Sequence, residues 1–244
     1  MFQQVLQLIR ISIISTTLLY SSYLDWKFRE VDDRVWMLSG SILLVLTILD
    51  LVFFNLTLEY VYVCLLSIGL SSGLAFLFYF LGFYGGADAK AILVVSLGLP
   101  VYKHQNQIHP FTGLSTLSNG LILSLTLPLC LACYNLYQLS RGNKIFEGFE
   151  HENVLRKFLA LMFGVRLKRS KGRKFWFMME EEKDSVRRFK FNLFSLDLNA
   201  IDRDDVWVTP GIPLLIFITA GFIYYIILGD ITYYFFKFLV LISG

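Results

Sequence analysis

Residues 35–54 read VWMLSGSILLVLTILDLVFF, which is apolar almost throughout. A helix that crosses a bilayer needs about 20 mostly apolar residues, and this run has that length. The rest of the chain has the same character, because 56% of its 244 residues are hydrophobic, 17% are charged and the mean hydropathy is +0.60. This composition is too apolar for a soluble domain of this size. The sequence therefore predicts an α-helical membrane protein.

Further apolar runs on both sides of this stretch bring the prediction to about six transmembrane helices. The predicted spans are Gln4–Leu24, Val35–Phe54, Tyr60–Phe83, Ala87–Leu99, Phe111–Leu139 and a last one from Pro210 to Leu228. The tail Ile231–Ser243 either extends the last helix or lies at the membrane interface. No basic residue precedes the first run and no small-residue cleavage site follows it, so we expect a retained helix rather than a removed signal peptide.

The positions of lysine and arginine predict the topology. Most of the 22 basic residues fall in the first loop, at Lys90 and in residues 140–209. Because cytoplasmic loops retain Lys and Arg, we expect both termini outside the plasma membrane and residues 140–209 in the cytoplasm. The chain then divides into residues 1–139 with five spans, a cytoplasmic α+β insert at 140–209, and residues 210–244 with the last span. This distribution accounts for the net charge of +3 and leaves no basic patch for nucleic acid.

The insert carries two patterns of its own. From Glu150 to Val165 the apolar residues recur at three and four, which predicts an amphipathic helix whose apolar face lies on the membrane or on a small sheet. Residues 174–179 and 187–198 are rich in phenylalanine and partly alternate, so we expect a β-hairpin with the charged stretch Glu180–Asp184 as its turn.

Acidic residues at the ends of apolar helices need a reason, because an ionised carboxylate in hydrocarbon is costly. Asp88 follows Gly85, Gly86 and Ala87 at the start of the fourth predicted span. Glycines allow positive φ and a close approach by another helix or an extended peptide. A plain helix cap favoured by the helix dipole explains Asp88 as well as a functional role does.

Asp25 closes the first predicted span and falls on the same cytoplasmic face as Asp88. Alone, it reads as an interfacial residue paired with Lys27 or Arg29. Two carboxylates at one membrane depth suggest a pair that shares a single proton. One carboxylate then takes a proton from water while the other, protonated, polarises an amide carbonyl, as in aspartic peptide hydrolysis.

These residues resemble the GxGD aspartic peptidases of the prepilin peptidase group, and most of all the archaeal preflagellin peptidases. The resemblance rests on Asp25, on Gly85-Gly86-Ala87-Asp88-Ala89-Lys90 and on Trp207-Val208-Thr209-Pro210-Gly211-Ile212-Pro213, and it covers essentially the whole chain in order. It implies that Asp25 and Asp88 are the catalytic aspartates, although Ala87 stands where a strict GxGD motif has its second glycine.

The same resemblance implies a substrate, which is a preflagellin or a type IV pilin-like precursor with a short basic leader cut at the cytoplasmic face. The implied partners are that precursor and membrane lipid, with no metal and no cofactor. Related bacterial enzymes that also N-methylate their product usually carry two C-x-x-C pairs near the first helix. This chain lacks those pairs, so we expect peptidase activity without methyltransferase activity.

For several residues near the two aspartates, the sequence allows more than one role. Glu30, Asp32 and Asp33 either dock a basic leader or form a solvated loop paired with Arg29 and Arg34. Lys90 either tunes the pKa of Asp88 or anchors its helix at the headgroups. We further hypothesise that Gly85-Gly86 is a hinge that closes the site around substrate.

Two other classes of function are open. A proton-coupled transporter would use the aspartates as a relay, but it predicts charges at mid-membrane depth on several helices, and the helix centres are nearly free of charge. A non-catalytic membrane scaffold would explain the insert but give the aspartate pair no purpose. The cysteines Cys64, Cys130 and Cys133 lie in apolar runs and read as packing residues, and the histidines His104, His109 and His151 lack metal spacing.

Overall fold

The computed structural model describes the chain except for residues 170–174, 184–185, 192–200, 202–203, 212 and 244. It divides into two compact units, which are described separately. Unit 1 comprises Met1–Ser124 and Pro213–Gly244, and unit 2 comprises Leu125–Ile212.

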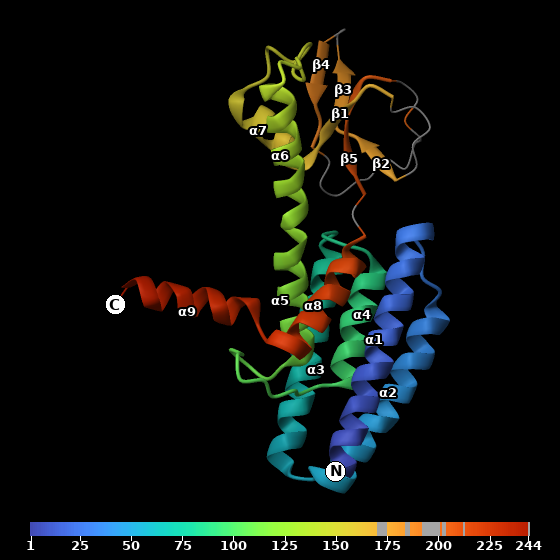
Figure 1. Cartoon of the computed structure of the whole chain (residues 1–244). Helices are drawn as coiled ribbons and strands as arrows, with labels where there is room; N and C mark the ends of the chain where they lie inside the picture. Colours follow the sequence, from blue (N-terminus) through green and yellow to red (C-terminus); the bar gives the residue numbers. More distant parts are fainter. Residues whose placement is uncertain (170–174, 184–185, 192–200, 202–203, 212, 244) are drawn as a thin grey trace. The chain divides into compact units, whose positions relative to one another are not determined.

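Unit 1 is a bundle of helices with one helix that leaves it (Figure 1). Its helices are α1 (Phe2–Phe28), α2 (Asp33–Phe54), α3 (Leu58–Phe80), α4 (Gly86–Gly98), α5 (Thr112–Ser124), α8 (Leu214–Leu228) and α9 (Ile231–Ser243). Helices suit these apolar runs because every backbone polar group inside a bilayer must be bonded within the segment. Side-chain caps start α2 and α3, where Asp32 accepts from Arg34 N and Thr57 accepts from Tyr60 N.

By length and composition, the described residues hold four helices able to cross a membrane: Phe2–Phe28, Asp33–Phe54, Leu58–Phe80 and Thr112–Ser140. The bent pair formed by α8 and α9 can add one more. α4, with 13 residues, is shorter than a full span. The prediction of a polytopic helical membrane protein is therefore confirmed in its coarse form.

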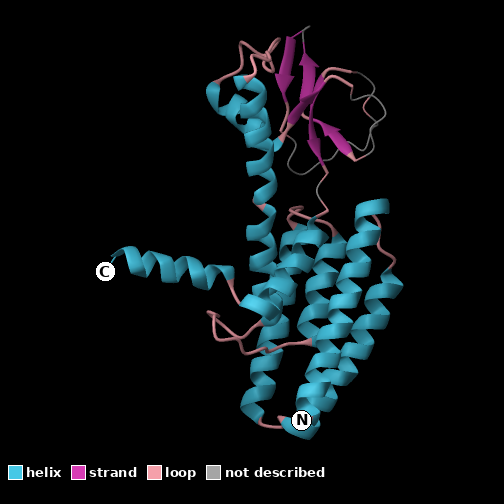
Figure 2. Cartoon of the chain, in the orientation of Figure 1, coloured by secondary structure: helices cyan, strands magenta, loops and turns pink. Residues whose placement is uncertain are grey.

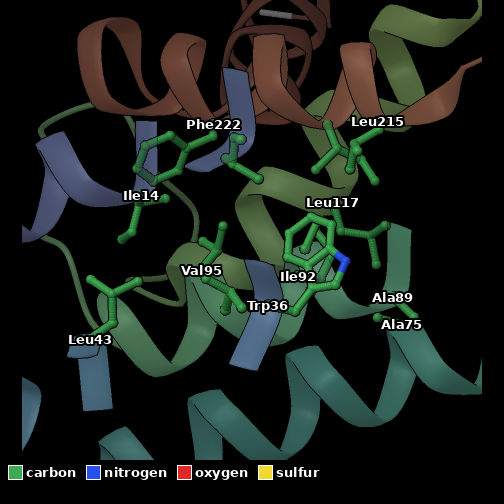
Figure 3. Packing of buried hydrophobic residues seen from close by; sticks show 14 of the residues in the cluster. Ile14, Trp36, Leu43, Ala75, Ala89, Ile92, Val95, Leu117, Leu215 and Phe222 are labelled. Atoms are coloured by element: carbon green, nitrogen blue, oxygen red, sulfur yellow. The ribbon is translucent and has the colours of Figure 1, made fainter. Parts of the chain in front are cut away.

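α4 lies at the centre of unit 1 and is apolar on all sides. Its residues Ala89, Ile92 and Val95 are buried among side chains of α1, α2, α3, α5 and α8 (Figure 3). A helix that is hydrophobic all round belongs in the interior of a bundle. This explains how a segment too short to span a membrane alone is held in the interior of the bundle.

α5 and α8 approach each other through glycines. A Cβ on Gly221 would lie 2.5 Å from Gly120 N and 2.7 Å from Thr116 O. Small residues let helix backbones come this close inside membranes. After α8 the chain turns at Gly229 (φ 95), and α9 is bent from α8 by 60°. The tail is therefore not a straight extension of the last helix.

Unit 2 combines helices with short strands, and it begins at Leu125, within the predicted fifth span. It contains α6 (Thr126–Ser140), α7 (Val154–Phe163), β1 (Val165–Leu167), β2 (Trp176–Met178), β3 (Glu180–Lys183), β4 (Val186–Phe189) and β5 (Val206–Pro210). The strands form an antiparallel three-stranded sheet in the order β1-β5-β2 and a separate antiparallel pair β3-β4 (Figure 2). Stacked aromatic rings fill the core, with Phe149 and Phe189 centroids 4.4 Å apart and Phe146 and Trp207 centroids 5.4 Å apart.

The predicted hairpin is wrong in its pairing. The charged stretch expected to be a turn forms strand β3, which pairs with β4, whereas β2 pairs with β5. Glu181 lies opposite Arg188 and Glu182 opposite Arg187, and opposite charges across a strand pair are favourable. Residues 192–198 of the prediction lie outside the described part of the chain.

The predicted amphipathic helix is present as α7, and its apolar stripe is exposed rather than packed on the sheet. Val154 is 84% exposed and Leu155 64%, while Ala160 on the opposite face is buried in the insert core. Asn153 caps its start, and Asn135 of α6 donates to Leu161 O at 2.9 Å near its end. Among the cysteines, Cys64 is buried, but Cys130 and Cys133 are exposed on α6, contrary to the packing expected for them.

Candidate functional site

Asp88 lies in the first turn of α4 and is 7% exposed. Its Oδ2 accepts a hydrogen bond from Gly85 N at 3.1 Å, as an acidic side chain in the first turn of a helix commonly does. None of the described residues donates to its Oδ1. The side chain thus caps the helix with one oxygen and keeps the other available.

Asp25 lies in the last turn of α1 and is half-buried. The helix ends at Phe28, and Arg29 takes the left-handed conformation (φ 59) while its N–H donates to Asp25 O at 3.0 Å. A residue in this conformation turns the chain away from the helix axis. Asp25 therefore lies at the end of the bundle where α1 ends.

The two carboxylates lie at nearly the same level because α1 and α4 run in opposite directions. The far end of α4 is level with Ile14 of α1, since a Cβ on Gly98 would lie 3.0 Å from Ile14 Cδ1. From there α1 rises about 16 Å to Asp25, and α4 rises about 15 Å back to Asp88, at about 1.5 Å per residue. Asp25 also lies within electrostatic reach of Asp88.

Arg29 is a cation that interacts electrostatically with both carboxylates. Burial lowers the pKa of its guanidinium, and the negative charges of Asp25 and Asp88 partly offset that effect. From the sequence, Arg29 had only the role of an ion-pair partner, either for Asp25 or for the acidic loop that follows it. Its signal was weak, because a basic residue one turn after an aspartate is also what an ordinary membrane interface shows.

The glycine motif sits between α3 and α4. The left-handed residue of this segment is Gly82 (φ 79), whereas Gly85 is extended (φ −79, ψ 161) and precedes the helix. A Cβ on Gly86 would meet the Tyr79 ring at 3.5 Å, which is ordinary contact. Ala87 is half-buried and packs against the bundle core, as a small residue can.

The acidic loop after α1 lies next to the site. Glu30, Asp32 and Asp33 line, with Leu24, Phe28 and Val31, a depression of about 720 Å³. Asp32 also caps α2, because its carboxylate accepts from Arg34 N at 2.8 Å. Lys90 Nζ lies 2.5 Å from Asp33 Oδ1, a contact that neither of the roles expected for Lys90 included.

Sequence reasoning missed a second charged group inside the bundle. Arg10 in the first predicted span and Asp50 near the end of the second were given no role. Both are buried and their side chains are 2.8 Å apart. Arg10 lies in the first half of α1 and Asp50 in the last turns of α2, so the pair places buried charge inside two spans whose centres were expected to be nearly free of it. An acid and a base in consecutive antiparallel spans were the available signal.

The arrangement of Asp25 and Asp88 suits acid–base chemistry on a neutral substrate. Two interacting carboxyls can hold one proton between them, so that one activates water and the other polarises a carbonyl. Such a pair acts on amide bonds without a metal ligand set.

The family described as Type IV leader peptidase family matches residues 12–134, which include both aspartates, and Archaeal Peptidase A24 C-terminus Type II matches residues 149–231. The chain is similar to a preflagellin peptidase of Methanococcus maripaludis, with 25% identity over 87% of this chain and 92% of that protein. It is equally similar to a preflagellin peptidase of Methanocaldococcus jannaschii, with 25% identity over 87% of this chain and 91% of that protein.

Proposed function

The chain belongs to the type IV leader peptidase family, and from this premise we propose that it removes the leader peptide of a preflagellin or pilin-like precursor at the cytoplasmic membrane face. The observation that carries the proposal is the buried carboxylate of Asp88. Its Oδ1 accepts no hydrogen bond from the described residues, and Asp25 lies within electrostatic reach. A carboxylate kept in this state is suited to bind water or substrate, because a buried lone pair left without a donor is costly.

In the proposed mechanism Asp25 and Asp88 are the catalytic residues and share one proton. The ionised carboxylate accepts a proton from water as the water oxygen attacks the scissile carbonyl carbon. The protonated carboxyl donates to the carbonyl oxygen and stabilises the charge that develops there. As the C–N bond breaks, the carboxyl protonated in the first step gives its proton to the leaving amine, and the other carboxyl takes back the proton it gave to the carbonyl oxygen. The pair thus returns to its starting state without a cofactor.

The topology belongs to the same proposal. We count α4 as a sixth, short span enclosed by the bundle, which leaves both termini outside and residues 140–209 in the cytoplasm, as the distribution of Lys and Arg favours. The exposed apolar stripe of α7 supports a position on the cytoplasmic membrane surface.

The acidic residues Glu30, Asp32 and Asp33 are the proposed docking site for the basic leader. All three line the depression beside Asp25, and opposite charges steer and orient a ligand more than they hold it. The triple change Glu30→Gln, Asp32→Asn and Asp33→Asn keeps the cap of α2, because asparagine caps as well as aspartate. We expect a higher KM with nearly unchanged kcat, and Glu59→Gln at the start of α3 is the matched control. An unchanged KM in the triple variant contradicts leader docking.

Gly85-Gly86 remains the proposed hinge for closing the site. A valine at Gly86 would restrict the backbone at the start of α4, while the Tyr79 contact leaves room for a Cβ. We expect Gly86→Val to fold but to lose kcat, and Gly69→Val in the open part of α3 to keep it. A fully active Gly86→Val protein rules the hinge out.

The decisive experiment is cleavage of a preflagellin-like precursor by membranes that contain the wild type, Asp25→Asn or Asp88→Asn. Asparagine keeps the shape and removes the titratable proton. Asp230→Asn is the matched control, because Asp230 is also fully buried, precedes a helix and has an Oδ1 without a donor among the described residues. We expect the wild type and Asp230→Asn to trim the leader and the other two to be inactive. Normal cleavage by Asp25→Asn or Asp88→Asn disproves the dyad.

A further inference from the structure

Arg10 and Asp50 form an ion pair in the interior of unit 1, distant from the two aspartates of the site. Arg10 Nη1 lies 2.8 Å from Asp50 Oδ2, and their side chains are 4% and 9% exposed. Arg10 belongs to α1 and Asp50 to the last turns of α2. Charges in a membrane interior are expensive, so such a pair needs a purpose beyond stability.

The pair is completed by the end of α4. Arg10 Nε donates to Gly98 O at 2.6 Å, and Thr47 Oγ1 of α2 donates to Leu97 O at 2.7 Å. The last carbonyls of a helix have no partner within that helix, and a cation at this end is favoured by the helix dipole. Two neighbouring helices therefore cap α4 with side chains. We call Arg10, Thr47, Asp50 and the carbonyls of Leu97 and Gly98 the α4 clamp.

Apart from the Lys90–Asp33 ion pair near its start, α4 makes mainly apolar contacts, and the α4 clamp adds directional hydrogen bonds at its end. The buried residues of α4 are mainly small or aliphatic, among them Ala89, Ala91 and Val95, and apolar contact is not directional. Hydrogen bonds depend steeply on distance and angle, so they fix one axial position. The clamp thereby sets the level of α4 against α1.

We propose that Arg10 is a positioning residue of the peptidase, which fixes the register of α4 against α1 and so the relative level of Asp25 and Asp88. This inference rests on the proposed function. Arg10 reaches about one turn along its own helix, because it bonds the residue that is level with Ile14. The stretch of α1 from Arg10 to Asp25 is longer than the stretch of α4 from Gly98 to Asp88. The reach of the Arg10 side chain along α1 compensates for this difference and brings the two carboxylates to one depth. One end of α4 is thus held by the clamp, while the other end carries Asp88.

The test compares Arg10→Met, Asp50→Asn and Thr47→Val with Thr16→Val, all as full-length protein in membranes. Thr16 is exposed on α1 and bonds only its own helix at Ser12 O, so it is a matched control that leaves the clamp intact. The substrate is a synthetic precursor with a basic leader that ends in glycine and precedes an apolar helix. The measurements are kcat, KM, the folded fraction from thermal unfolding, and the pH profile of kcat/KM.

We expect Arg10→Met to lower kcat about 100-fold with KM changed less than about 3-fold, since a misplacement near 1 Å has this effect on rate. Thr47→Val should lower kcat by a smaller factor, and Thr16→Val should not change it. The bell-shaped pH profile of Arg10→Met should narrow by about one pH unit, because carboxylates that move apart interact less. Arg29 interacts electrostatically with both carboxylates, and none of the variants alters it.

A variant that loses activity only in proportion to its folded fraction, with an unmoved pH profile, shows a structural clamp and overturns the proposal. Unchanged kcat in folded Arg10→Met also overturns it. If Arg10→Met does not fold, Thr47→Val and Asp50→Asn decide the question by the same criteria. A wild type that does not cleave the precursor, or an active Asp88→Asn, marks a failure of the proposed function instead.

Discussion

Two buried carboxylates, Asp88 in unit 1 and Glu180 in unit 2, differ in how fully their oxygens are hydrogen-bonded. Glu180 accepts from Arg187 Nε and Nη2 at 3.1 and 2.8 Å through Oε1, and from Trp207 N at 2.9 Å through Oε2. Asp88 accepts from Gly85 N at 3.1 Å through Oδ2, and its Oδ1 has no donor among the described residues. Both lie in interiors where an ionised group without partners is costly.

This difference in hydrogen-bond partners helps to distinguish a structural acidic residue from a functional one. A carboxylate whose oxygens are filled by a guanidinium and a backbone N–H serves the fold, because nothing else can bind to it without breaking those contacts. A carboxylate with an unfilled oxygen can bind water or substrate. Asp88 and Asp230 both have such an oxygen among the described residues, and Asp88 has in addition a second carboxylate, Asp25, within electrostatic reach. Asp88 and Glu180 are both buried and both carry a carboxylate, and it is their partners that differ.

The largest effect should follow from Asp88→Asn. We expect cleavage to fall at least about 1000-fold while the melting temperature stays the same or rises, because the change removes a buried charge and keeps the shape. Cleavage of the precursor and thermal unfolding of the same membrane preparation measure both quantities. A clear loss of stability would make Asp88 a structural acid like Glu180 and break the comparison.

Glu180→Gln should show the reverse pattern. The change leaves the Arg187 guanidinium partly buried without its counter-charge, which we expect to destabilise unit 2 by about 3 kcal/mol. Hydrogen exchange resolved to β3, β4 and β5 measures this opening. Glu181→Gln is the control on the same strand, since Glu181 is exposed and its contact with Lys190 is a distant 3.8 Å. Equal exchange in both variants contradicts a structural role for Glu180.

A smaller effect on stability should follow from a change in the packing of unit 1 that leaves its charged groups intact. Gly221→Ala places a Cβ against the backbone of α5, and we expect it to destabilise the bundle by about 2 kcal/mol. Gly73→Ala on α3 meets nothing within 4 Å and should leave the unfolding temperature unchanged. If the two alanine variants unfold alike, close approach of α5 and α8 contributes little.

The smallest effect concerns a partly exposed pair of unit 2. Hydrogen bonds from Arg166 lower the pKa of Asp205 below its ordinary value of 3.8. The ionised form therefore stabilises the fold above about pH 4, and this contribution is lost as the pH falls through the lowered pKa. Asp205→Asn should destabilise unit 2 by less than about 1 kcal/mol at neutral pH. Hydrogen exchange at β5 in a pH series should show wild type and variant converging below about pH 4, and a gap that stays constant contradicts this assignment.

Sequence reasoning succeeded where the signal is local and repeats along the chain. Apolar runs predict α1, α2 and α3 because the bilayer requires a set length of apolar helix. The periodicity of residues 150–165 predicts α7, and the position of Asp88 after glycines at the start of an apolar helix singles it out. The family resemblance carried by Asp25 and Asp88 agrees with the family that matches residues 12–134.

The failures share one cause, which is that pairing between distant segments leaves no local trace. The stretch Glu180–Asp184 looks like a turn because it is charged, yet strand β3 forms there since Arg187 and Trp207 fill the oxygens of Glu180. In the sequence, Arg10 looks like a charge tolerated within an apolar span. Its partner, the carbonyl of Gly98, belongs to a distant segment and lies beside it only in the folded chain.

The sequence by itself determined that this is a helical membrane protein with a mixed insert, and it singled out the two aspartates proposed as its site. Only the tertiary structure decided which strands pair, that α4 is enclosed by its neighbours, and that the oxygens of Glu180 are filled while Asp88 and Asp230 each keep one oxygen without a donor among the described residues. The physical reason is that hydrophobicity and helix caps act over a few neighbouring residues, whereas an ion pair or a strand register depends on groups that meet only when the chain has folded.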